Sequence, residues 1–159
     1  MRKILVVASV LFLLFLSSAE NSFACSCVSE DKRSSLNQRV REAYKNSTAV
    51  FSAKILIITE QPEAGNVKVK IRLVKSWKGK IFKTLTITTG LGGGDCGYHF
   101  EAGKVYLIYA YQDENNKLNT NICTRTTGIV SNKEVTILNK LQQKKFKPFP
   151  KLPERPHVR

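Results

Sequence analysis

Hydrophobic and polar residues alternate through the middle of the chain. A two-residue period predicts β-strands, because successive side chains of a strand face opposite sides. The period is clearest over Val67–Trp77, where apolar positions are expected to face inward and basic positions outward. The inward set is Val67, Val69, Ile71 and Leu73, and the outward set is Lys68, Lys70, Arg72 and Lys75 or Lys78. Similar stretches predict four further strands, over residues 48–59, 84–89, 104–112 and 117–125.

Two segments have a helical period instead. Residues 34–47 and 132–146 each carry apolar side chains at intervals of three or four residues, which predicts a short amphipathic helix at each end of the strand-rich part. Asn132 is the predicted N-cap of the second helix. The predicted apolar faces are Leu36, Val40 and Ala43–Tyr44 in the first helix and Val135, Leu138 and Leu141 in the second.

Five strands flanked by two helices predict a mostly β fold. The arrangement is typical of a five-stranded OB-type Greek-key barrel with N- and C-terminal helices, and a β-sandwich is the alternative. Residues 25–145 are expected to form this single domain, since a chain of that length is a comfortable size for one core.

The first 24 residues have the layout of a secretory signal peptide. A short basic start precedes the apolar run Ile4–Leu16, and the small residues Ser22 and Ala24 precede the expected cut. The apolar run is shorter than the roughly 20 residues of a membrane span. A lipoprotein signal is the competing interpretation because Cys25 follows the cut, but such a signal would want a leucine-like residue in place of Ser22. We therefore expect a secreted protein that begins at Cys25 and has no membrane span.

Basic residues dominate the charge. The chain has 26 Lys and Arg against 12 Asp and Glu, a formal net charge of +14, and residues 1–24 carry only one net positive charge of it. Residues 146–159 form a basic, proline-rich segment that is predicted to be a disordered tail. Such charge favours anionic polymers, such as heparan-like chains or cell-wall polymers, as partners. An exported chain without a nucleic-acid motif is not expected to bind nucleic acid, and we expect a monomer.

The mature chain has four cysteines, Cys25, Cys27, Cys96 and Cys123. An even number in an oxidising compartment predicts two disulfides. A bond between Cys25 and Cys27 would close a tiny ring, so two connectivities remain, and both tie the mature N-terminus to two distant points. The alternative is a metal site, but zinc ligands usually come in close pairs, whereas Cys96 and Cys123 are far apart in the sequence.

The segment Gly90–Phe100, "GLGGGDCGYHF", contains a glycine run before Cys96. No Lys-Ser or Lys-Thr follows, so a phosphate-binding loop is not indicated. We expect a flexible connection pinned by Cys96, whose glycines allow close approach of a partner. His99 is expected to be a packed or edge residue, and His157 lies in the tail. With no catalytic constellation and no free thiol, neither enzymatic activity nor a cofactor is expected.

A mature chain that starts "CSCV" resembles the tissue inhibitors of metalloproteinases, in their N-terminal inhibitory domain, which is a netrin-like module on an OB barrel. The resemblance covers most of residues 25–130. "AVFSAKIL" is similar to the family's first strand, "VKIRLVKSWKGK" to its second, and "CGYHF" and "NICTRTTGI" to segments at its later cysteines. The spacing of the cysteines is also similar. The resemblance implies the disulfides Cys25–Cys96 and Cys27–Cys123, in a single-domain form of the family.

The resemblance also implies a function, the inhibition of secreted zinc metalloproteases. In such inhibitors the amino nitrogen and carbonyl oxygen of the first cysteine, here Cys25, chelate the protease's zinc, and the chain holds no metal of its own. Ser26 would enter the protease's specificity pocket. The other expected protease contacts are Cys27, Val28, Gly94, Asp95 and Cys96. The alternative is a non-inhibitory netrin-like module that binds polyanions or another secreted protein.

Overall fold

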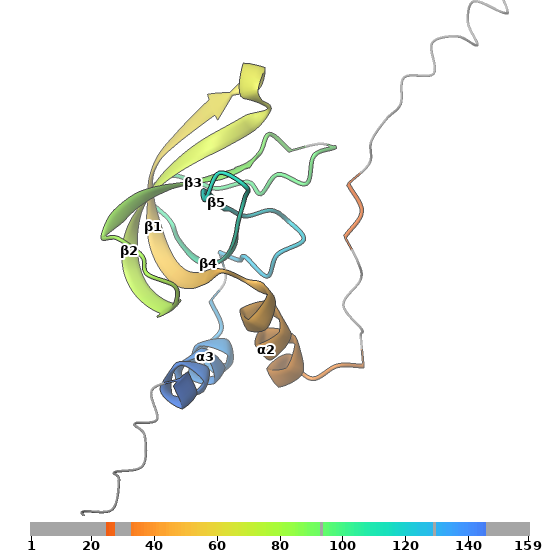
Figure 1. The fold of residues 1–159 in the computed structure, drawn as a ribbon, viewed down its shortest axis with the longest axis vertical. Helices are drawn as coiled ribbons and strands as arrows, with labels where there is room; N and C mark the ends of the chain where they lie inside the picture. Colours follow the sequence, from red (N-terminus) through yellow and green to blue (C-terminus); the bar gives the residue numbers. More distant parts are fainter. Residues whose placement is uncertain (1–24, 28–32, 93, 129, 146–159) are drawn as a thin grey trace, which may run out of the picture.

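A computed structural model of the chain describes residues 25–27, 33–92, 94–128 and 130–145. The predicted signal peptide, Val28 and the predicted tail over 146–159 lie outside the described residues. The elements, labelled in Figure 1, are α2 (Leu36–Asn46), β1 (Ala49–Gln61), the 3-10 helix η1 (Pro62–Ala64), β2 (Asn66–Lys78), β3 (Thr84–Gly90), β4 (Val105–Gln112), β5 (Leu118–Asn119) and α3 (Asn132–Lys145).

The five strands form one mixed sheet that closes on itself in the order β1-β2-β3-β5-β4. β1 is antiparallel to both β2 and β4, and β3 and β5 form the one parallel pair, with Thr88 opposite Asn119. β1 reaches both neighbours because its pairing with β2 shifts register three times, and such bulges bend a strand. The mostly β fold with five strands and two helices, predicted from the sequence, is confirmed.

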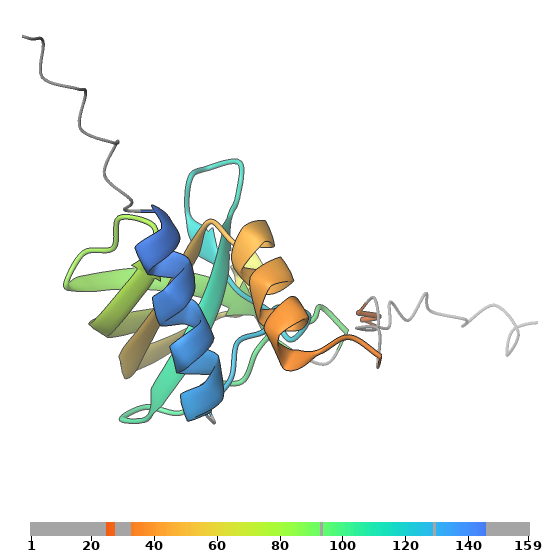
Figure 2. The same ribbon diagram turned by 90° about the horizontal axis from the view of Figure 1, so that it is seen from below.

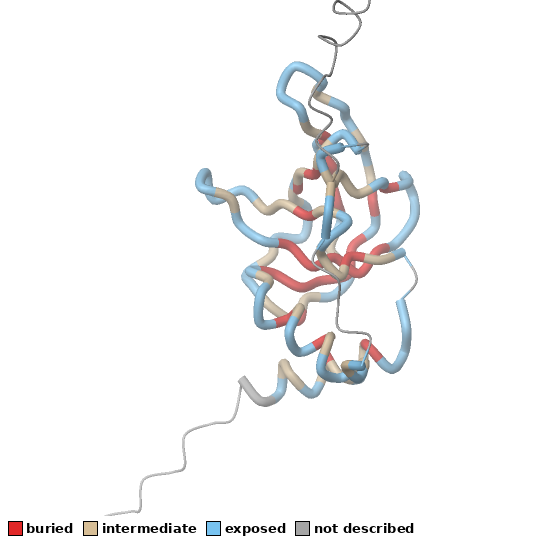
Figure 3. The backbone as a smooth tube through the Cα atoms, turned by 90° about the vertical axis from the view of Figure 1, so that its right-hand side faces the viewer, coloured by how far each residue is buried: buried red, intermediate tan, exposed pale blue. Residues whose placement is uncertain are grey.

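The interior of the barrel contains the apolar residues that the alternation predicted to face inward. Val69 and Ile71 of β2 are completely buried, whereas Lys68 before them and Lys70 between them are exposed. Figure 3 shows that the buried residues lie mainly along the strands, with a few on the helices. The barrel core consists of Ala49, Phe51, Ala53, Ile55, Val67, Val69, Ile71, Ile87, Phe100, Tyr106, Ile108 and Ala110.

Both helices cover the same side of the barrel, where α2 and α3 lie beside each other (Figures 1 and 2). A second apolar cluster joins them to the strands, and its buried members are Val40, Tyr44, Val50, Trp77, Leu107, Tyr109 and Leu138. Lys78 was one of two candidates for the outer face of β2. Its ammonium group instead donates hydrogen bonds to the carbonyl oxygens of Tyr44, Lys45 and Ser47, at the C-terminus of α2. A cation there is favoured because the last helical carbonyls lack partners within the helix.

Two differences from the sequence prediction have a clear local cause. β5 comprises two residues instead of the predicted 117–125, because the side-chain oxygen of Asn121 accepts hydrogen bonds from the backbone N–H groups of Cys123 and Thr124 and turns the chain. The N-cap of α3 is Ser131 rather than Asn132, since Ser131 O accepts the first helical hydrogen bond, from Val135 N at 3.0 Å. In the described part of the chain, no helix combines the length and the apolar character that a bilayer crossing requires.

Candidate functional site

Two disulfides attach the segment Cys25–Cys27 to the barrel. Cys25 is bonded to Cys96 and Cys27 to Cys123, with Cα–Cα distances of 5.2 and 5.1 Å and sequence separations of 71 and 96 residues. This is the pairing that the resemblance implied. No free cysteine remains among the described residues. The segment is therefore attached to the barrel through both of its cysteines, on either side of Ser26.

The barrel topology places Cys96 and Cys123 side by side. Cys96 follows β3 and Cys123 follows β5, and these strands are parallel neighbours, so both loops leave the same end of the barrel. The backbone N–H of Ile122 donates to Cys96 O at 2.9 Å and ties the loops together. The sulfur atoms of Cys96 and Cys123 lie 3.8 Å apart, and those of Cys25 and Cys123 lie 4.0 Å apart. All four cysteines thus form one compact cluster.

Asp95 organises the glycine-rich loop around its own carboxylate. That carboxylate accepts hydrogen bonds from the backbone N–H groups of Leu91 (2.6 Å), Gly92 (2.7 Å) and Gly97 (3.0 Å). The hydrogen bond from Gly92, followed by that from Gly97, holds the pKa of Asp95 below its usual value. The described part of the loop is therefore held by its own acidic residue, whereas the sequence predicted a flexible connection.

Two glycines of this loop are required by close packing. A Cβ atom on Gly97 would lie 2.3 Å from the carbonyl oxygen of Gly90. A Cβ atom on Gly90 would lie 2.6 Å from the carboxyl carbon of Asp95. No larger residue fits at either position without moving the backbone or the Asp95 side chain. The glycines serve the internal packing of the loop as well as any approach by a partner.

The predicted protease-contact residues gather at this cluster. Ser26 is exposed between the two disulfide-bonded cysteines, and exposed Gly94 and Asp95 directly precede Cys96. His99, which was expected to be packed or at an edge, is exposed, while its neighbour Phe100 is buried against Tyr106 with ring centroids 4.9 Å apart. The structure brings together Cys25, Ser26, Cys27, Gly94, Asp95 and Cys96 of the predicted set, and Val28 is outside the described residues.

Threonine hydroxyl groups that the sequence analysis did not single out hold the loop of Cys123 on β4. Thr120 Oγ1 donates to Tyr109 O at 3.1 Å, and Thr126 Oγ1 accepts from Tyr109 N at 3.0 Å. The hydroxyl groups of Thr120, Thr124 and Thr126 also lie within hydrogen-bond distance of one another. The only sign of this network in the sequence is the group of threonines around Cys123, in a segment predicted to be a strand.

No protein-family model matches the chain, and no curated protein sequence matches it. Function is therefore inferred from the residues of this site, their exposure and their geometry. The site combines a three-residue segment fixed at two cysteines, an exposed serine between them, and a loop beside them that its own acidic residue holds together.

Proposed function

We propose that the mature chain inhibits secreted zinc metalloproteases by placing the amino nitrogen and carbonyl oxygen of Cys25 on the protease's zinc ion. The observation that carries the proposal is the double attachment of Cys25–Ser26–Cys27 to the barrel, with Ser26 exposed between the two links. In the full chain the nitrogen of Cys25 is a peptide nitrogen. Removal of residues 1–24 converts it to an amine, which is the group that binds a metal.

The chemistry of both partners fits this mode. A catalytic zinc ion keeps one coordination position for water or substrate and can expand to five ligands, so the amine and carbonyl of one residue can chelate it once the water leaves. The amine must be neutral to coordinate. Its ordinary pKa is about 8, so deprotonation at pH 7 costs on the order of 1 kcal/mol. The two disulfides lower the cost of binding because the segment is ordered before it meets the protease.

Ser26 and the loop before Cys96 supply the contacts beside the zinc. The side chain of Ser26 enters the specificity pocket, and Gly94 and Asp95 flank it, as their position next to the Cys25–Cys96 bond allows. The charge of Asp95 faces a protease that has a catalytic carboxylate of its own. Three backbone N–H groups already bind the Asp95 carboxylate, which reduces its repulsion of that group.

The proposal includes a fold assignment, namely a netrin-like barrel of the OB type. The closed strand order β1-β2-β3-β5-β4 supports it, because OB barrels are five-stranded with Greek-key connections. The placement of the four cysteines supports it as well, since the first residues of the mature chain reach the loops after β3 and β5.

The test compares two preparations against a panel of secreted zinc metalloproteases. One begins at Cys25, as verified by mass spectrometry, and the other carries a single additional alanine before Cys25. The extension leaves both disulfides and the barrel intact, so it serves as its own control for folding. We expect inhibition by the first preparation alone. Equal inhibition by both, or inhibition by neither, would overturn the proposal.

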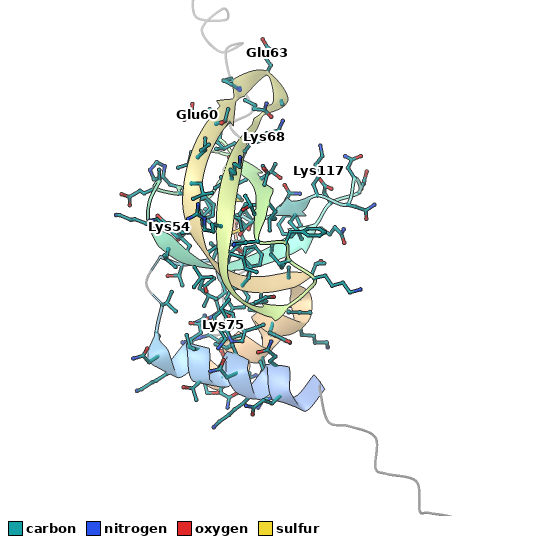
Figure 4. The ribbon with its side chains drawn as sticks, turned by 90° about the vertical axis from the view of Figure 1, so that its left-hand side faces the viewer. Lys54, Glu60, Glu63, Lys68, Lys75 and Lys117 are labelled. Atoms are coloured by element: carbon teal, nitrogen blue, oxygen red, sulfur yellow. A yellow bond between two sulfur atoms is a disulfide. The ribbon has the colours of Figure 1, made fainter. Side chains whose placement is uncertain are left out.

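A second candidate function is the binding of anionic polymers, and the outer face of β1 and β2 favours it. Arg72 and Lys54 are cross-strand partners, and Lys68 and Lys70 precede Arg72 at alternate positions of β2. All four side chains are exposed, and no described acidic residue forms an ion pair with them. Figure 4 shows Lys54, Lys68 and Lys75 on this side of the molecule. Like charges so close together favour a polyanionic partner.

This second function predicts binding to a sulfated or phosphorylated polymer that weakens steeply with salt. It also predicts that the alanine extension before Cys25 has no effect on polymer binding, because the basic face does not include the N-terminus. A double variant, Lys68→Glu with Lys70→Glu, should lose the binding. If that variant still binds the polymer, the binding site is not the outer face of β1 and β2.

A further inference from the structure

The two disulfides lie close enough together for sulfur atoms of one to approach those of the other at distances typical of metal ligands. The distances between sulfurs of different disulfides are 3.8 Å for Cys96 and Cys123 and 4.0 Å for Cys25 and Cys123. The sulfurs of Cys25, Cys96 and Cys123 all lie within 4.8 Å of one another. A zinc ion with four thiolate ligands has Zn–S distances of about 2.3 Å, so the edges of its tetrahedron are about 3.8 Å. The Cys96–Cys123 and Cys25–Cys123 sulfur distances are close to that edge length.

Hydrogen bonds link the loops of Cys96 and Cys123 in addition to the two disulfides. The backbone N–H of Ile122 donates to Cys96 O, and the side chain of Asn121 accepts from Cys123 N at 3.0 Å. Asp95, next to Cys96, is held by three backbone N–H groups. No cysteine belongs to the apolar core. None of these hydrogen bonds involves a sulfur atom, so reduction does not break them directly and they favour keeping the two thiols close together.

In the sequence, the distance between Cys96 and Cys123 argued against a metal site, but in the fold the two residues are close together. Cys96 and Cys123 are 27 residues apart, but the parallel pairing of β3 and β5 makes them neighbours. Cys25 and Cys27 supply the second pair, and the segment that carries them already lies against both loops. Cys27 and Cys123 are exposed, so a reductant and a metal ion can reach the cluster.

We propose that the reduced chain binds one Zn²⁺ ion through the thiolates of Cys25, Cys27, Cys96 and Cys123. Two equivalents of a water-soluble phosphine reduce the two disulfides. Each phosphine takes one oxygen atom from water, becomes a phosphine oxide and leaves two thiols. Zn²⁺ then displaces four thiol protons and forms four Zn–S bonds, which gives a centre of net charge −2. The metal replaces both disulfides as the link between the N-terminal segment and the barrel.

The test uses the mature chain, reduced with the phosphine under anaerobic conditions and titrated with Co²⁺, whose visible absorption reports its ligands. We expect the intense absorption of tetrahedral cobalt thiolate, saturation at one Co²⁺ per chain and complete displacement by one equivalent of Zn²⁺. The oxidised chain should show none of this, since its sulfurs are bonded. Absence of the thiolate bands from the reduced chain would overturn the proposal, whether that chain is folded or unfolded by circular dichroism.

Two variants identify the ligands. Cys27→Ser removes one thiolate and should weaken Co²⁺ and Zn²⁺ binding at least tenfold, with less intense thiolate bands. Ser26→Ala, one position away in the same segment, is the matched control and should bind as the unchanged chain does. Equal binding by the Cys27→Ser variant would exclude the four-thiolate site. The alanine extension before Cys25 should leave zinc binding unchanged, which separates this site from the proposed inhibition.

Discussion

Asp95 is the residue on which the shape of the loop before Cys96 depends. Its carboxylate accepts hydrogen bonds from the backbone N–H groups of Leu91, which precedes the glycine run, of Gly92, which begins it, and of Gly97, which follows it. An ionised carboxylate makes stronger hydrogen bonds of this kind than the neutral acid does. The order of the loop, and with it the position of Cys96 and of the attached Cys25, is therefore linked to the ionisation of one exposed side chain.

That link predicts a pH dependence. The pKa of Asp95 is lowered in the folded chain, so its contribution to loop order is present above the ordinary aspartate pKa of about 3.9 and is lost as the pH falls through the lower folded value. In an NMR titration, the amide signals of Gly92 and Gly97 should shift together with a midpoint below that ordinary value. The Asp95→Asn variant should show no such transition. A midpoint at or above the ordinary value would contradict the role of Asp95.

At the scale of elements, one buried carboxylate connects α3 to the barrel. Glu134 of α3 is only 3% exposed; it accepts a hydrogen bond from Tyr109 Oη at 2.8 Å and pairs with Arg125 Nε at 2.9 Å. Burial, followed by the hydrogen bond to Glu134, raises the pKa of Tyr109, so its hydroxyl stays a donor at physiological pH. Because Arg125 lies two residues after Cys123, this contact also supports the loop of the candidate site.

Removal of this carboxylate should therefore destabilise the protein. Glu134→Ala removes a carboxylate that pairs with a largely buried guanidinium and accepts from a buried hydroxyl, and we expect a loss of about 3 kcal/mol in the free energy of unfolding. Glu101→Ala is the matched control, because Glu101 pairs with Lys104 at 2.7 Å on the exposed surface. Its expected loss is below about 1 kcal/mol. Urea denaturation measures both, and equal losses would show that the buried pair adds no stability.

The contrast between regular and irregular segments explains what the sequence predicted well. The alternation around Val69 and Ile71 identified β2 and its two faces, because burial on one face imposes a two-residue period. The burial of Glu134 has no such periodic signal, since it depends on contacts with Arg125 and Tyr109, which lie outside its own helix. The ordered loop around Asp95 likewise had no signal in the sequence. A run of glycines is typical of flexible segments, and only the folded backbone shows which N–H groups one carboxylate can reach.

At the scale of the whole molecule, the closed barrel carries a short N-terminal segment at one end. The two disulfides span 71 and 96 residues, and closing loops of that length constrains the unfolded chain by about 4 kcal/mol each in the entropic treatment. The same two bonds hold Ser26 exposed beside the loop of Asp95. Stability and the proposed activity thus depend on the same four cysteines, and the basic outer face of β1 and β2 is a separate surface.

The most direct measurement of the central claim is a crystal structure of the chain, processed to begin at Cys25, in complex with the catalytic domain of a zinc metalloprotease. The proposed function predicts that the amino nitrogen and carbonyl oxygen of Cys25 both bind the protease's zinc at about 2.1 Å in place of its water, with Ser26 in the adjoining pocket. A complex in which the zinc keeps its water and Cys25 lies away from it would contradict the claim.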